Sequence, residues 1–166
     1  MVPKEIRRTL RIREGDPMEI FTNHEGEIIL KKYSPIGEMD KFAKEYAEVL
    51  AQNSNFKVIV SDRDQVIAVA GTGKKEYLEK NISNELEKLM MERETLSTIN
   101  NSKSPISITE NEKTEICGQV ISPIICEGDV IGSVILMSKD EKQNITATEQ
   151  KLVSVAAAFL GKQMEN

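Results

Sequence analysis

The residues best suited to chemistry stand at the start of the chain, where several cations surround one acid. Residues 1–13 carry 5 − 1 = +4, from Glu5 and five basic side chains: Lys4, Arg7, Arg8, Arg11 and Arg13. The whole chain carries −5, so the remaining residues carry −5 − 4 = −9. A guanidinium group presents a planar fork of donors that fits phosphate oxygens and guanine edges. This charge distribution favours contact between the first residues and a polyanion.

A short helix must position these cations. Pro3 suits the first turn of a helix, where its missing N–H costs no hydrogen bond. Ile6 and Leu10 are four residues apart and fall on one face, while Arg7, Arg8 and Arg11 share another. The spacing predicts a helix of about two turns that docks its apolar face and turns its arginines outward. The alternative is that these arginines form an ordinary solvated helix face.

Other residue types that carry chemistry are sparse. His24 is the only histidine, so no Ser-His-Asp set can be argued. Cys117 and Cys126 fit neither a C-x-x-C redox motif nor a zinc-binding spacing. We predict no catalytic residues, no metal and no cofactor, and expect that the protein is not an enzyme.

A glycine-containing stretch, Gly71-Thr72-Gly73-Lys74-Lys75, invites a phosphate-binding interpretation because glycine amides at a helix start can bind anions. It lacks the G-x-x-x-x-G-K-[ST] spacing of a phosphate-binding loop. A turn between a strand and a helix explains both glycines equally well. We therefore favour the turn.

The periodicity of the chain predicts the elements that hold these residues. Residues 18–32 alternate around a turn containing Gly26, which is typical of a β-hairpin. Residues 34–37 form the clearest boundary. Beyond it, apolar residues predict helices and strands in the following order: helix 38–52, strands 56–62 and 65–71, helices from Lys74 and from Ser83, a polar loop 96–114 with a short strand at 105–109, a hairpin over 115–138, and helix 146–164.

These elements predict an α+β protein with two domains. Residues 1–35 form a small basic module, and residues 36–166 form a domain with an antiparallel sheet flanked by helices, including helix 38–52 and the C-terminal helix 146–164. The last helix begins with a capping box at Thr146 and Glu149. No apolar run reaches the length of a membrane span and no signal peptide is visible, so we expect a cytoplasmic protein without a membrane partner.

The opening segment VPKEIRRTLRIREGDPMEIF, with EIILKKY after it, resembles the AbrB-type swapped-hairpin DNA-binding domain of bacterial transition-state and sporulation regulators. The continuation YSPIGEMDKFAKEYAEVL and the closing AAAFLGKQME are similar to the stage V sporulation protein T family, in which a GAF domain follows the basic domain. The resemblance implies binding to double-stranded DNA. It places the family's basic residues at Arg7 and Arg8, with Lys4 in the same motif, whereas Arg11 is added from charge and spacing.

The resemblance also implies an assembly. Hairpins of two chains interleave in that family, and GAF domains pair through terminal helices, so a homodimer or a dimer of dimers is expected. We expect helices 38–52 and 146–164 to form the contact between the two chains. The family pattern starts earlier, with a basic strand that this chain lacks. We attribute the lack to a gene start placed too late or to trimming, and expect weaker DNA binding because a strand would be missing from the interleaved sheet.

The resemblance favours a DNA-binding transcription regulator of sporulation genes, whose GAF-like domain dimerises and senses an unidentified small-molecule effector. The ligand wall is expected at residues 74–94 and 97–114, with an empty pocket as the alternative. Two other functions remain open. One is an antitoxin-like interaction module. The other is a free-standing GAF-type methionine sulfoxide reductase that uses Cys117 and Cys126.

Overall fold

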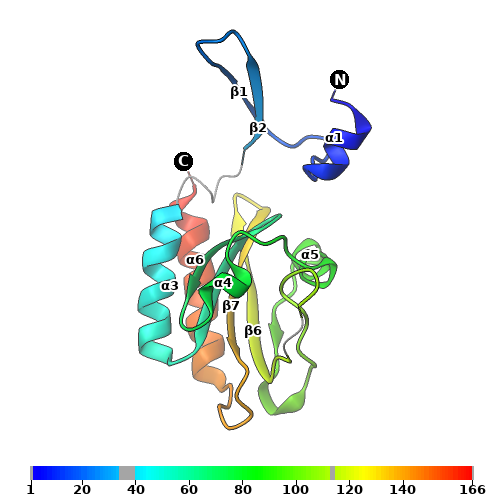
Figure 1. The fold of residues 1–166 in the computed structure, drawn as a ribbon. Coiled ribbons are helices and arrows are strands. Elements are labelled where there is room, and N and C mark those ends of the chain that lie inside the picture. The colour runs from blue at the N-terminus through cyan, green and yellow to red at the C-terminus, as the bar shows by residue number, and fades with distance from the viewer. Residues whose placement is uncertain (1, 34–39, 113–114, 166) are drawn as a thin grey trace.

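The computed structural model describes residues 2–33, 40–112 and 115–165 (Figure 1). We call residues 2–33 the head and the described residues of 40–165 the body. In Figure 1 the head stands above the body as a small hairpin and a short helix. The predicted domain boundary between residues 35 and 36 lies outside the described residues.

The head contains one helix and one hairpin. Helix α1 spans Lys4–Thr9, and strands β1 (Met18–Thr22) and β2 (Ile28–Lys32) pair antiparallel. Asn23 organises the turn, since its side-chain oxygen accepts the backbone N–H groups of Glu25 and Glu27 at 3.0 and 2.9 Å. Gly26 adopts φ +82°, which only glycine tolerates readily. The predicted hairpin is confirmed.

Helix α1 is shorter than predicted, and this separates the three arginines. The chain leaves the helix after Thr9, and Arg11 adopts a left-handed φ of 51°, with the Ile12 N–H donating to the Arg7 carbonyl at 2.8 Å. A left-handed residue is a common way to close a helix. Arg11 therefore lies beyond the helix, and the predicted face shared by all three arginines does not form. The apolar face does not dock either, because no residue of α1 is buried.

The body is built on a five-stranded antiparallel sheet in the order β4-β3-β7-β6-β5. Two hairpins supply four of the strands, and the pairing of β3 with β7 joins them. The strand bounds are as follows: β3 Lys57–Asp62, β4 Val66–Ala70, β5 Leu96–Ser97, β6 Gly118–Cys126 and β7 Asp129–Ser138. The predicted pairs of strands are confirmed.

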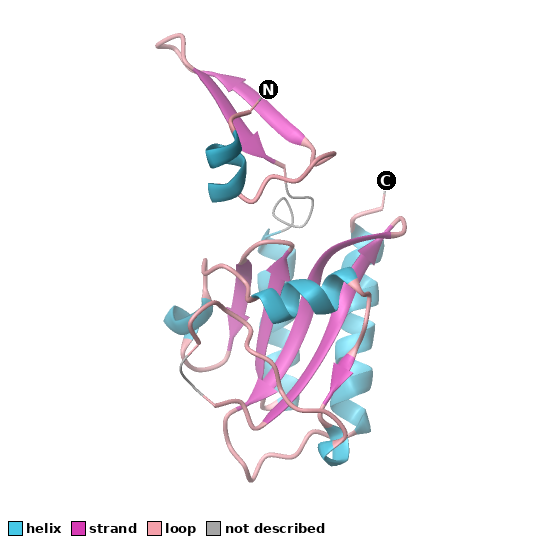
Figure 2. Cartoon of the chain, turned by 90° about the vertical axis from the view of Figure 1, so that its right-hand side faces the viewer, coloured by secondary structure: helices cyan, strands magenta, loops and turns pink. Residues whose placement is uncertain are grey.

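Helices cover both faces of this sheet. The long helices α3 (Asp40–Ser54) and α6 (Ala147–Gln163) lie on one face, while α4 (Lys74–Tyr77) and α5 (Asn84–Met91) lie on the other (Figure 2). The predicted caps form: Ser83 accepts the N–H of Leu86 at 3.0 Å, and Thr146 and Glu149 close a capping box.

Each face of the sheet carries its own aliphatic core. One core packs α3 and α6 against the sheet, and the other packs α5, Tyr77 and the loop through Ile108 against the opposite face. Gly161 brings α6 close to the sheet, since a Cβ there would collide with the carbonyl of Ile125. No head residue among those described belongs to either core.

Two details of the sheet edge differ from expectation. The edge strand is β5, in a segment predicted to be loop, whereas residues 105–109 form no strand and contribute only an isolated bridge from Thr109 to Ile82. The alternation of Ile106 and Ile108 predicted the wrong segment as the strand, because it reflects the packing of Ile108 in the core and not pairing in the sheet. Within the described ranges, none of the helices combines the length and apolar character needed to span a membrane.

Candidate nucleic-acid interface and ligand cavity

The cations of α1 face solvent. Lys4, Arg7 and Arg8 are exposed, and within the described part of the chain no ion pair or hydrogen bond engages their side chains. Within the helix, the hydroxyl of Thr9 donates to the Glu5 carbonyl. The side-chain donors of Lys4, Arg7 and Arg8 remain free to meet an external anion.

Arg11 occupies a different environment from the cations of α1. One of its guanidinium nitrogens pairs with Glu110 of the body, and the other donates to the Ile82 carbonyl at 3.4 Å. Its side chain is 22 % exposed. The structure therefore separates the four candidate DNA-binding residues into three that are free and one that the body holds.

A carboxylate that sequence reasoning missed organises the end of the head. Asp16 accepts the backbone N–H of Arg13 at 2.8 Å and lies 3.4 Å from the Lys32 ammonium and 3.6 Å from the Arg63 guanidinium. Its burial opposes ionisation, but the Arg13 N–H and the two cations outweigh that effect and lower the pKa of Asp16 below 3.8. The residue's position in a turn before Pro17 gave no sign of this role.

The hairpin of the head exposes apolar side chains instead of burying them. Ile20 is 69 % exposed and Ile28 is 72 % exposed, and their neighbours Phe21 and Leu30 are about half exposed. A unit this small buries too little surface to be stable alone and normally needs a partner. The exposed apolar side chains of the hairpin therefore form only part of a core, which a partner would complete.

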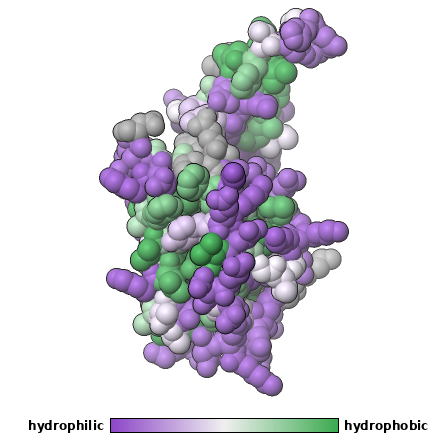
Figure 3. All heavy atoms as spheres, turned by 90° about the vertical axis from the view of Figure 1, so that its left-hand side faces the viewer, coloured by the Kyte–Doolittle hydropathy of each residue, from purple (hydrophilic) through white to green (hydrophobic). Residues whose placement is uncertain are grey.

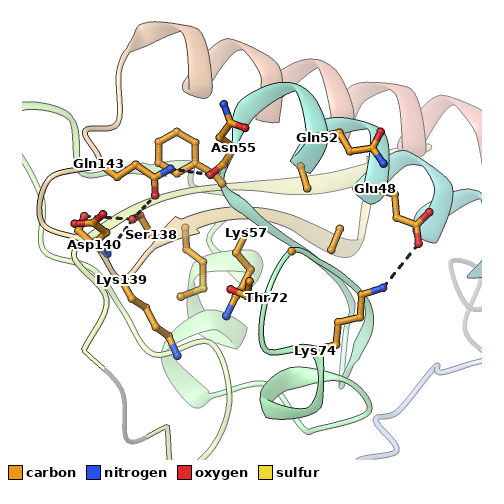
Figure 4. Close-up of a pocket in the computed structure, with 15 residues that line it drawn as sticks. Glu48, Gln52, Asn55, Lys57, Thr72, Lys74, Ser138, Lys139, Asp140 and Gln143 are labelled. Carbon is orange, nitrogen blue, oxygen red and sulfur yellow. Dashed lines mark hydrogen bonds and ion pairs between the residues drawn. The ribbon is translucent and has the colours of Figure 1, made fainter.

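A cavity of about 920 Å³ opens at the lower end of the body's sheet (Figure 4). The end of α3, the start of β3, the β4–α4 turn and the segment after β7 surround it. Only Lys74 comes from the predicted ligand wall. Much of the rest of that wall packs into the core of its face through Ile82, Leu86 and Leu89, although the end of α5 lines a second cavity beside the head.

Two lysines meet at the floor of this cavity. The ammonium nitrogens of Lys57 and Lys139 lie 5.0 and 5.2 Å from the centre of the Tyr77 ring. Lys139 pairs with Glu76 at 2.7 Å, whereas none of the described carboxylates lies within ion-pair distance of Lys57. Burial, followed by repulsion from Lys139, lowers the pKa of Lys57. Glu76 and Glu112 act on the pKa of Lys57 in the opposite direction, and a further anion beside its ammonium would add to their effect.

The two cysteines occupy opposite ends of β6. Cys117 precedes Gly118, and Cys126 ends the strand, so an extended chain separates them by about 30 Å. A disulfide requires Cα atoms within about 7 Å. Burial and neighbouring carboxylates raise the pKa of both thiols, which disfavours the reactive thiolate. This geometry does not favour a reductase that uses these two thiols as a redox pair.

The outer sides of α3 and α6 carry an apolar patch, which we call the helix patch: Phe42, Tyr46, Val49, Leu152, Val155 and Phe159. Tyr46 and Phe159 stack with ring centres 5.2 Å apart and join the two helices. Figure 3 shows apolar atoms on the side of the body that α3 covers. Ala156 and Ala157 are buried in the body's own core, whereas Ala158 is exposed.

Two remaining sequence candidates have structural roles. Gly71, Thr72 and Gly73 form the turn between β4 and the four-residue helix α4, as the strand–turn–helix interpretation predicts. His24 lies in the exposed hairpin turn. Within the described ranges, histidines, cysteines and acidic residues form no group of three or more that could hold a metal ion.

Sequence comparison matches both parts of the chain. Residues 38–165 match the model described as "Stage V sporulation protein T C-terminal, transcription factor", and residues 2–38 match the model described as "Antidote-toxin recognition MazE, bacterial antitoxin". The chain is 47 % identical to stage V sporulation protein T of Bacillus subtilis (strain 168) over 165 residues, which cover 99 % of this chain and 90 % of that protein.

Solved structures resemble the body. The GAF domain of an Acinetobacter phosphoenolpyruvate-protein phosphotransferase matches with a TM-score of 0.61 and 10 % identity, covering 81 % of this chain and 84 % of that one. A type II free methionine-R-sulfoxide reductase from Thermoplasma acidophilum matches with a TM-score of 0.58 and 12 % identity, covering 78 % and 94 %. At these identities the likeness establishes a GAF fold and nothing of activity.

We predict that Arg63→Gln raises the pKa of Asp16, since it removes one of the two cations that favour the carboxylate. Because the folded pKa lies below 3.8, Asp16 contributes stability above that pH and loses it as pH falls through the folded value. NMR titration of the Asp16 carboxyl carbon measures the change. The exposed control Lys75→Gln should leave the titration unaltered, and an equal response of both variants would contradict this account.

Proposed function

The chain belongs to the stage V sporulation protein T family of sporulation transcription regulators, and we propose that it binds double-stranded DNA through Lys4, Arg7 and Arg8 of α1. The observation that carries this assignment is the exposure of these three cations without any partner among the described residues. Phosphate contacts release counterions, which supplies most of the affinity for a polyanion. Arg11 contributes less to DNA binding than these three residues, because it forms an ion pair with Glu110.

We propose that the working form contains two or more copies. The exposed apolar side chains of Ile20 and Ile28 support pairing of two heads, and the helix patch supports pairing of two bodies. Two heads side by side present two sets of cations, which matches the symmetry of a duplex with two half-sites. The antitoxin-like alternative is not favoured, since the family match extends through the folded body.

Arg7→Ala/Arg8→Ala should weaken duplex binding and flatten its salt dependence. If three cations in each of two chains neutralise about six phosphates, the slope of log K against log salt is about −5, and the double variant should reduce it to about −2. Fluorescence anisotropy with a labelled duplex across a salt series gives both quantities. Lys75→Ala removes a body cation as the control, and a double variant with the slope of the unmodified protein would contradict the assignment.

Phe159→Glu should separate the bodies, because a carboxylate in the helix patch would be desolvated on pairing. In a background with Ile28→Glu, which removes the apolar contact between heads, we expect light scattering to report a halved mass, while circular dichroism stays unchanged because Phe159 is 37 % exposed. Ser154→Glu places the same charge on an exposed position of the same helix and should keep the original mass. An unchanged mass for Phe159→Glu would remove the helix patch as the contact between the two chains.

We further propose that the cavity at Lys57 and Lys139 receives the effector, and that this effector is a small anion such as a carboxylate or phosphate. Two observations support this chemistry: none of the described carboxylates forms an ion pair with Lys57, and the two lysines repel each other. Inorganic phosphate is a simple probe, followed by the amide signals of residues 71–73 in NMR spectra. Binding should weaken at least tenfold in Lys57→Gln and persist in Lys75→Gln, and equal binding by both variants would exclude this site.

A further inference from the structure

Charged side chains from the head and the body meet in one group, which we call the interdomain charge cluster. The head contributes three cations and one acid, and the body contributes one cation and three acids. The members are Arg11, Arg13, Asp16 and Lys32 of the head and Arg63, Asp64, Glu87 and Glu110 of the body.

Each head cation in this cluster contacts a carboxylate of the body. Arg11 pairs with Glu110, and Arg13 pairs with Glu87. Lys32 has the most partners of the three. Its ammonium lies 2.5 Å from the Asp64 carboxylate and donates a hydrogen bond to the Arg11 carbonyl at 2.8 Å. The three side chains are between 18 % and 28 % exposed, so most of their surface is covered.

Charge, and not apolar packing, holds the head in this position. Neither core cluster contains a described residue of the head. A cavity of about 510 Å³ lies between the two parts and is lined on the body side by Met90, Met91 and Val130. Ion pairs without an apolar seal are weakened by dissolved salt and by any competing polyanion.

One pair in the cluster is imperfectly satisfied. The Arg13 Nη1 and the Asp64 Oδ1 are both buried without a hydrogen-bond partner, and they lie 3.7 Å apart. Buried polar atoms in this state are costly, and opening the cluster to water or to phosphate would satisfy them. This cost makes the arrangement in which the head contacts the body less stable relative to one in which the two are apart.

We propose that the carboxylates of Asp64, Glu87 and Glu110 act as an internal competitor for DNA. They hold three cations of the head against the body, while Lys4, Arg7 and Arg8 remain free for a first contact with the duplex. Phosphates then displace the carboxylates, and the head leaves the body as DNA binds. This inference rests on the proposed function and adds a closed state in which the head has only part of its charge available.

The test compares the full chain with the variant Asp64→Asn/Glu87→Gln/Glu110→Gln. Three ion pairs of the strength usual at protein surfaces correspond to about one power of ten in an equilibrium, so duplex binding should tighten about tenfold at low salt. The dependence of log K on log salt should also be steeper for the triple variant, because up to three more cations per chain are free to neutralise phosphates. Glu94→Gln/Glu115→Gln/Glu141→Gln is the matched control. It removes the same charge from exposed positions that make no ion pair with a described residue.

A second readout follows the head without relying on DNA affinity. Spin labels at Glu25→Cys in the hairpin turn and Lys103→Cys in the body, with both native cysteines replaced by serine, report the distance between the two parts by pulsed electron resonance. With labelled chains diluted into an excess of unlabelled ones, we expect one narrow distance within the chain at low salt in the otherwise unmodified protein. The distribution should broaden when salt or a duplex is added, and it should be broad at all salt concentrations in the triple variant.

The outcomes separate the two proposals. Equal duplex affinity and slope for the triple variant and its control would overturn the competition, as would an unchanged label distance on DNA binding. A label distance that the triple substitution does not alter would overturn the closure itself. If neither protein binds a duplex even at low salt, the proposed function fails, while the labels still show whether the carboxylates hold the head.

Discussion

The structure depends on an unequal distribution of burial between its two parts. The body places its apolar residues on both faces of one antiparallel sheet, whereas none of the described apolar side chains of the head is buried or belongs to either core. Hydrophobic burial supplies most of the free energy of folding, so the body has the means to be stable on its own and the head does not. The head must obtain its order from charges on the body or from a second chain.

This imbalance gives the basic segment two kinds of partner. The same guanidinium chemistry that suits phosphate also suits the carboxylates of an acidic body, and in a single chain the carboxylates are always close by. The structure divides the cations accordingly: those of α1 are free, and those after the helix are engaged. Electrostatic contacts of this kind are exchangeable, because they depend on salt and on competing charges rather than on a fitted surface.

The GAF fold of the body imposes a second constraint. Ile82, Leu86 and Leu89 pack into the core on one face, and the cavity of about 920 Å³ opens at the end of the sheet, beside Lys57. Filling the other face from α3 and α6 leaves the outer sides of those helices apolar. The proposed ligand site therefore borders the end of α3, whose outer side carries part of the proposed pairing surface.

The sequence by itself determined the elements whose signals are local. The hairpin at Gly26, the cap at Ser83 and the capping box at Thr146 follow from residue types within a few positions of each other, and all three are present. The motif around Arg7 and Arg8 was enough to indicate the family. The charge difference between the first residues and the rest was also visible from counting alone.

Only the tertiary structure decided which cations are free. Arg11 and Arg8 look equivalent in sequence, but a left-handed turn after Thr9 sends Arg11 to Glu110, about one hundred positions away. The same holds for Asp16, Lys32 and Asp64, which meet through contacts between distant segments. Local pattern carries no information on such pairs, because an ion pair requires proximity in space and leaves no periodicity in the chain.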